Sequence, residues 1–92
     1  MATQTIAAGH TAEIDLGNSP GMSISTKDGI ATVYVDYYNT TTGNYTSAIS
    51  ITAGYLSPFQ VEPGISFDIE KSDLLSEHVR VGTENASITV TY

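Results

Sequence analysis

The sequence predicts an all-β fold: a compact β-sandwich, or small barrel, of about eight or nine short, mostly antiparallel strands in an immunoglobulin-like or jelly-roll-like arrangement. Apolar and polar residues alternate over short runs along most of the chain, as in strands that bury one face. Turn-forming residues separate these runs at intervals of about 8–12 residues. With 92 residues the chain makes one domain, residues 1–92.

The first elements follow from this alternation. Residues 3–8 form a weak first strand that ends at a glycine, and residues 10–16 form a second strand. Residues 17–21 read Gly-Asn-Ser-Pro-Gly, a loop made of strong turn formers. The expected inward side chains of the second strand are Ala12, Ile14 and Leu16.

A β-hairpin is predicted around Asp28-Gly29. Residues 22–27 and 30–35 alternate on either side of this dipeptide, and Asp-Gly suits the two positive φ angles of a type I′ turn. A slip of one residue would turn the apolar side chains outward, so the register is fixed. The expected pairs are Thr26 with Ala31, Ile24 with Val33 and Met22 with Val35.

The second half of the chain predicts further strands and one helical turn. Gly43 suits a left-handed position in the turn at residues 39–44, and Glu62-Pro63-Gly64 suits a type II turn. Pro58 cannot donate to a ladder, so its strand should lie at an edge or a bulge. The expected strands are residues 31–38, 45–53, 55–61, 65–70, 79–81 and 88–92, with a helical turn within residues 71–77 capped by Ser72 or Asp73.

Two packed sheets would enclose the inward apolar side chains in one core. A chain of this length buries only about 60–65% of its unfolded surface, so it builds a single small core. The expected core residues are Ile6, Ile14, Leu16, Ile24, Val33, Val35, Ile49, Ile51, Phe59, Phe67, Ile69, Val79, Val81, Ile88 and Val90.

Charge and cysteine content exclude several classes of function. The net charge is −7, and the only basic residues are Lys27, Lys71 and Arg80, too few for the basic patch that nucleic acid or an anionic membrane needs. The absence of cysteine excludes disulfides and thiolate metal sites. The first residues lack a signal-peptide pattern, and no apolar run has membrane-spanning length, so we expect synthesis in the cytoplasm.

No residue set in the sequence amounts to a catalytic or cofactor signature. The densest acidic group is Asp68, Glu70, Asp73 and Glu77, whose pattern favours a solvated face over a calcium site. The two histidines have no partner at ligand spacing, and no serine stands in an elbow-like motif. We therefore expect no enzyme activity, no cofactor and no metal.

A tyrosine-bearing strand face is the candidate interface. Tyr34, Asp36 and Tyr38 lie on the face of their strand opposite Val33 and Val35. An outward tyrosine stripe provides contact area at low entropy cost. The alternative is that a second sheet or a loop covers this face, so that its tyrosines belong to the core. The candidate interface residues are Tyr34, Asp36, Tyr38, Tyr45 and Tyr55.

The style of the whole chain resembles a family of viral proteins. It is small, acidic, cysteine-free and rich in threonine, begins near Thr3-Gln4-Thr5-Ile6 and ends on residues 87–92, Ser-Ile-Thr-Val-Thr-Tyr. In these respects it resembles small virion proteins of tailed bacteriophages, in particular head-decoration (cement) proteins. The resemblance implies a structural protein, made in the host cytoplasm, that resides on the capsid surface of the virion. It also implies binding to major capsid subunits, and a homo-oligomer with a trimer favoured.

A second interpretation belongs to a different class of function. An immunoglobulin-like or carbohydrate-binding module on a fibre or a cell surface would share the same fold. It would be a stable monomer with a ligand site among the candidate tyrosines. Light scattering, followed by binding to capsid shells, discriminates between the two interpretations.

Overall fold

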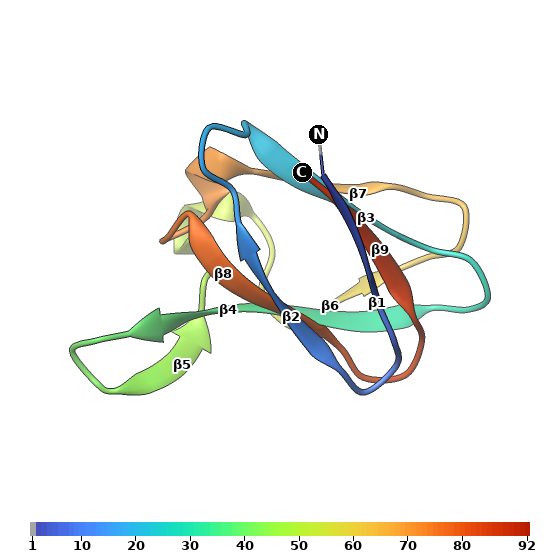
Figure 1. Ribbon diagram of the computed structural model, residues 1–92, viewed down its shortest axis with the longest axis horizontal. Helices are drawn as coiled ribbons and strands as arrows, with labels where there is room; N and C mark the ends of the chain where they lie inside the picture. The colour runs from blue at the N-terminus through green and yellow to red at the C-terminus, as the bar shows by residue number, and fades with distance from the viewer. Residues whose placement is uncertain (1) are drawn as a thin grey trace.

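The computed structural model describes residues 2–92 and shows an all-β protein with two antiparallel sheets packed face to face (Figure 1). Its nine strands confirm the predicted fold class. The strands are β1 (Thr3–Ile6), β2 (Thr11–Asp15), β3 (Gly21–Thr26), β4 (Ala31–Asn39), β5 (Asn44–Ser47), β6 (Phe59–Val61), β7 (Phe67–Glu70), β8 (His78–Thr83) and β9 (Ile88–Thr91), and two short 3-10 helices are η1 (Ile51–Ala53) and η2 (Lys71–Asp73).

The chain alternates between the two sheets except at β4, β5 and β6, which follow one another in the same sheet. Sheet A has the strand order β1-β9-β3-β7, and sheet B has the order β2-β8-β4-β5, with β6 also paired to β4. Every strand pair is antiparallel. Most neighbours within a sheet are therefore distant in sequence, and contacts between distant segments hold the fold together.

The core lies between the sheets and consists of the alternating inward side chains. Ile14, Ile24 and Val33 are fully buried within it. The predicted core is confirmed apart from two residues: Ile51 is 89% exposed and Phe67 is half-buried. The structure adds Met22, Ala31, Ala48 and Val61 to the core.

The predicted hairpin at Asp28-Gly29 is wrong. β3 pairs with β7 and β9, whereas β4 pairs with β5, β6 and β8, so the dipeptide connects sheet A to sheet B. A type I′ turn needs positive φ at both central residues, and neither Asp28 nor Gly29 has it. Instead, the Thr26 hydroxyl donates to the Gly29 carbonyl at 3.0 Å and closes a wider connection. The apolar faces of β3 and β4 thus meet across the interior and not side by side in one sheet.

The predicted strand at residues 45–53 is also wrong in its second half. β5 ends at Ser47, and the chain then enters η1, whose first turn is capped when the Ser50 hydroxyl accepts the Thr52 N–H at 3.4 Å. This excursion carries Ile51 into solvent. The chain returns as β6, which pairs with Ala31 to Val33 on the edge of β4 that β5 occupies further along.

The remaining turns agree closely with the sequence. Gly43 has a φ of 75° and Gly64 a φ of 80°, as the bulged hairpin and the type II turn require. The predicted helical turn is shorter than expected, because η2 covers only Lys71–Asp73. Its N-cap is Glu70, which makes no side-chain cap, so neither Ser72 nor Asp73 caps it.

Among residues 2–92, no helix has the length and apolar character needed to cross a membrane.

Candidate functional site

The outer face of sheet B continues into a projecting hairpin. β4 is the longest strand, and its pairing with β8 ends at Asp36, while its pairing with β5 runs on to Asn39 and Asn44. Residues 37–47 therefore form a two-stranded extension, which we call the arm (Figure 1). An isolated two-stranded hairpin is only marginally stable in water, so the arm needs contacts that hold it to the body.

A row of alternating charge crosses the sheet at the base of the arm. Register pairs Glu13 on β2 with Arg80 on β8, and Arg80 with Asp36 on β4. The Arg80 Nη2 lies 3.4 Å from the Asp36 Oδ2, and both side chains are largely shielded from solvent. Opposite charges at directly opposed positions stabilise the pairing of neighbouring strands.

Tyr45 holds the arm against this row. Its ring lies over the Arg80 guanidinium, with 3.6 Å between the guanidinium carbon and the ring centroid. Its hydroxyl donates to the Glu13 Oε1 at 3.0 Å, so one side chain reaches from β5 to the far edge of sheet B. The ring also meets Tyr38 edge-to-face, with 5.5 Å between centroids. The arm is thereby fixed by a cation–π contact and a hydrogen bond to a charged acceptor.

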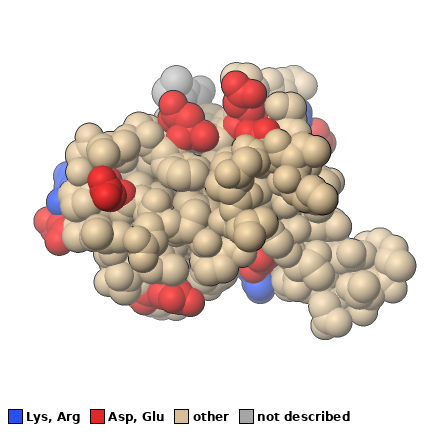
Figure 2. Space-filling view, turned by 180° about the vertical axis from the view of Figure 1, so that it is seen from behind, with Lys and Arg blue, Asp and Glu red and all other residues tan. Residues whose placement is uncertain are grey.

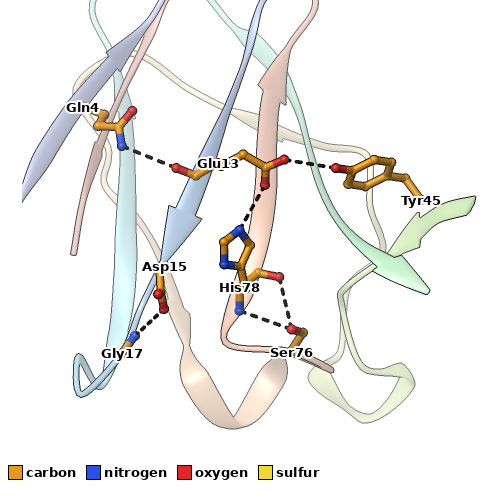
Figure 3. Close-up of polar contacts among 7 residues, drawn as sticks. All are labelled: Gln4, Glu13, Asp15, Gly17, Tyr45, Ser76 and His78. Atoms are coloured by element: carbon orange, nitrogen blue, oxygen red, sulfur yellow. Dashed lines mark hydrogen bonds and ion pairs between the residues drawn. The ribbon is translucent and has the colours of Figure 1, made fainter. Parts of the chain in front are cut away.

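The Glu13 carboxylate connects two parts of the face. Figure 3 shows it between the Tyr45 hydroxyl and His78, whose Nε2 lies 3.5 Å from the Glu13 Oε2. The hydrogen bond to this carboxylate raises the pKa of Tyr45 above its ordinary value, because removing the phenolic proton would put two negative charges together. Tyr45 therefore stays a donor throughout the neutral range.

A shallow hollow lies beside this contact. It has a volume of about 220 Å³ and is bounded by both aromatic and polar side chains. The Arg80 Nε next to it is buried and has no hydrogen-bond partner among residues 2–92. The residues that line the hollow are Glu13, Tyr37, Tyr38, Tyr45, Ser76, His78 and Arg80.

The structure brings together four of the five predicted interface residues. Tyr34, Asp36 and Tyr38 follow one another along the outer face of β4, and Tyr45 joins them from β5. The face is not covered by sheet A, since Tyr38 is 53% exposed and Tyr45 is 39% exposed. Tyr34 is half-buried because its ring lies against Gly82 of the neighbouring strand.

Tyr55 does not belong to this face. Its ring meets Phe59 and Phe67 edge-to-face, with centroid distances of 5.7 Å and 5.2 Å, at the margin of the core. Burial, with a smaller contribution from the Asp73 charge, raises the pKa of Tyr55. The sequence placed it with the other tyrosines because of proximity along the chain, but the η1 excursion separates them.

Sequence reasoning missed a long uncharged segment. From Tyr37 to Val61 the chain contains no Asp, Glu, Lys or Arg, although the net charge of the whole protein is −7. This segment includes the whole arm, and Figure 2 shows the arm as an uncharged lobe that projects from a body with acidic patches. It also holds four of the exposed large apolar side chains, namely Tyr38, Tyr45, Ile51 and Leu56. A charge plot along the sequence would have found it.

Two residues of the acidic cluster near η2 pair with protein groups. Asp68 accepts hydrogen bonds from the hydroxyls of Ser23 and Ser66, and Glu77 lies 3.3 Å from the Lys71 ammonium. Within residues 2–92, no three His, Cys, Asp or Glu side chains converge in a way that could hold a metal ion. The outer face of sheet B offers aromatic surface, a shielded cation and hydrogen-bonding groups, which suit binding to another molecule.

No protein-family model, curated protein or solved structure matches this chain.

Proposed function

We propose that this chain is a non-catalytic structural protein that decorates a tailed-bacteriophage capsid by binding major capsid subunits through the arm and the adjoining face of sheet B. The observation that carries the proposal is the arm itself. An uncharged hairpin with exposed tyrosines projects from an acidic body.

The composition of this surface matches that of protein–protein contacts. The centres of such interfaces are depleted in charged residues and enriched in tyrosine and arginine. The arm supplies Tyr38 and Tyr45, and Arg80 lies directly beneath Tyr45. Tyr45 is already held in place, so little side-chain entropy remains to be lost on binding. The net negative charge of the body repels other acidic surfaces and leaves the uncharged arm as the surface that approaches a partner.

The proposed partner, the major capsid subunit, is inferred from the resemblance of the chain to head-decoration proteins. A protein bound in many copies to a repeating capsid lattice needs only modest affinity at each contact. The direct test is mass spectrometry of purified particles, in which this chain should appear in many copies. Co-sedimentation of the purified protein with capsid shells that lack it is the second test.

A matched pair of variants locates the contact. Tyr38 and Ile65 are exposed to similar extents, 53% and 55%, but Ile65 lies outside the arm. We expect Tyr38→Ala to reduce co-sedimentation with shells and Ile65→Ala to leave it unchanged. Equal binding by both variants would show that the arm is not the docking surface.

The hollow beside Tyr45 supports the carbohydrate-binding alternative. It combines aromatic walls with the hydrogen-bonding groups of Ser76, His78 and Arg80, as sugar sites do. However, Arg80 occupies one face of the Tyr45 ring, so a sugar could stack only on the remaining aromatic surface. A monomer that ignores capsid shells but binds a glycan would replace the decoration proposal with this one.

A further inference from the structure

Edge strands of a sheet expose backbone groups, and most edges in this fold carry a feature that prevents pairing with another chain. β2 carries the exposed carboxylates of Glu13 and Asp15, and β7 carries those of Asp68 and Glu70. Charged side chains on an edge oppose pairing with another strand. β6 has only three residues and follows Pro58 closely, which limits what could be added to it.

The edge of β1 is engaged by the opposite sheet. The Gln4 amide on β1 donates to the Glu13 carbonyl of β2 at 3.5 Å (Figure 3). The same amide donates to the Tyr92 hydroxyl at 2.9 Å. β1 therefore lies next to β2 at one side of the sandwich.

β5 has none of these protections. It contains no charged residue and no proline, and it lies in the uncharged segment from Tyr37 to Val61. Figure 1 shows it at the margin of the molecule, where the arm extends away from the body. An exposed sheet edge of this kind is a surface to which another strand can add.

The register identifies the backbone groups that this edge presents. The Ala48 N–H donates to the Val35 carbonyl at 2.9 Å, while the Val35 N–H donates to the Ser57 hydroxyl at 3.0 Å, so Val35 and Ala48 occupy a hydrogen-bonded position of the ladder through one bond. Hydrogen-bonded and non-hydrogen-bonded pairs alternate along an antiparallel ladder, so Thr46 bonds to β4 while Tyr45 and Ser47 do not. The N–H and C=O groups of Tyr45 and Ser47 thus point away from β4, toward the open side.

We propose that β5 pairs antiparallel with β5 of a second copy of this chain, about a twofold axis at Thr46. Tyr45 of each copy then lies opposite Ser47 of the other, and each of these two pairs exchanges two backbone hydrogen bonds. The strand is complementary to itself, and it brings no like charges into contact although each copy carries a net charge of −7. The pairing joins two copies of sheet B into one continuous sheet. It rests on the geometry of β5 and not on the proposed capsid role.

The position of the twofold axis at Thr46 makes the pairing testable with charged substitutions at this residue. Thr46 lies directly opposite its own counterpart, in a non-hydrogen-bonded pair whose side chains are close. We expect the weight-average mass in analytical ultracentrifugation to rise from 9.7 kDa toward twice that value as concentration increases to about 1 mM. Thr46→Glu alone and Thr46→Lys alone should each raise the dissociation constant by about tenfold or more, because each places like charges together. An equimolar mixture of the two variants should restore the pair.

Controls separate this pairing from other association and from misfolding. Thr5→Glu on the exposed part of β1 gives the same net charge as Thr46→Glu and should leave association unchanged. If circular dichroism shows that a Thr46 variant is unfolded, amide hydrogen exchange of the wild-type protein provides the second measurement. The amides of Tyr45 and Ser47 should gain protection with increasing concentration, and that of Thr46 should not. A wild-type monomer at 1 mM, unchanged association of both charged variants, failure of their mixture to pair, or protection that does not depend on concentration would overturn the proposal.

Discussion

Replacing Gly82 with alanine tests how the outer face of sheet B is packed. Gly82 is buried beneath the ring of Tyr34, its partner on β4. Two ring carbons and the hydroxyl oxygen of Tyr34 lie 2.5 Å or less from the position of an added Cβ, whereas real contacts of this kind need at least 3.0 Å. The nearest ring atom lies 2.2 Å from the added Cβ and ordinary van der Waals contact begins at 3.4 Å, so the ring would have to move by at least 1.2 Å. Overpacking of this kind costs about 2 kcal/mol in the free energy of unfolding.

For a domain of this size, that loss lowers the melting temperature by about 10 °C. Whether Gly82→Ala destabilises or stabilises the protein depends on the residue at position 34. In a Tyr34→Ala protein the obstacle is gone, and alanine at position 82 should stabilise the strand by about 0.5–1 kcal/mol relative to glycine. Thermal and urea unfolding of the four proteins in this double-mutant cycle gives the coupling directly. If Gly82→Ala is neutral or stabilising in the wild-type background, then Tyr34 does not cover Gly82 and the described packing of this face is incorrect.

Three further predictions concern the core, an edge and the arm. Gly21→Ala should destabilise β3–β7 pairing by about 3 kcal/mol, as seen in urea unfolding, because its Cβ would meet the rigid Ile69 carbonyl and no side chain can yield. Ile24→Ala should cost about 2–5 kcal/mol in the same assay, since Ile24 is fully buried between the sheets; a loss under 1 kcal/mol would contradict that placement. The raised pKa of Tyr45 means that its bond to Glu13 stabilises the fold at neutral pH and is lost as pH rises above about 10. NMR titration should show Glu13→Gln lowering that pKa, and an unchanged pKa would exclude the bond.

The alternation of apolar residues was enough to predict the fold class and most of the core. It was not enough to predict which strands are neighbours. Alternation shows which side of a strand is buried, but two buried faces can lie side by side in one sheet or face each other across the core. β3 and β4 take the second arrangement, and Asp28-Gly29 spans the two sheets without a tight turn.

The candidate site was predictable only where its residues share one strand. Tyr34, Asp36 and Tyr38 alternate with core residues, so their common outer face followed from the sequence. Arg80 and Glu13 reach the same face from β8 and β2, and their contacts with Tyr45 depend on a strand order that no local pattern encodes. Ile51 failed as a core prediction for a related reason: its apolar character fits a strand, but the chain leaves the sheet after Ser47.

β4 belongs to the core and to the arm at once, and this has a mechanical consequence. Its first half carries the buried Val33 and Val35 between β8 and β6, while its second half extends outward with β5 alone. A pull on the arm along the strand would load the hydrogen bonds on both sides of β4 together, in shear, and not open them one at a time. Tension applied at the tip would thus be borne by a strand that is paired on both edges and carries core residues, without a hinge in between.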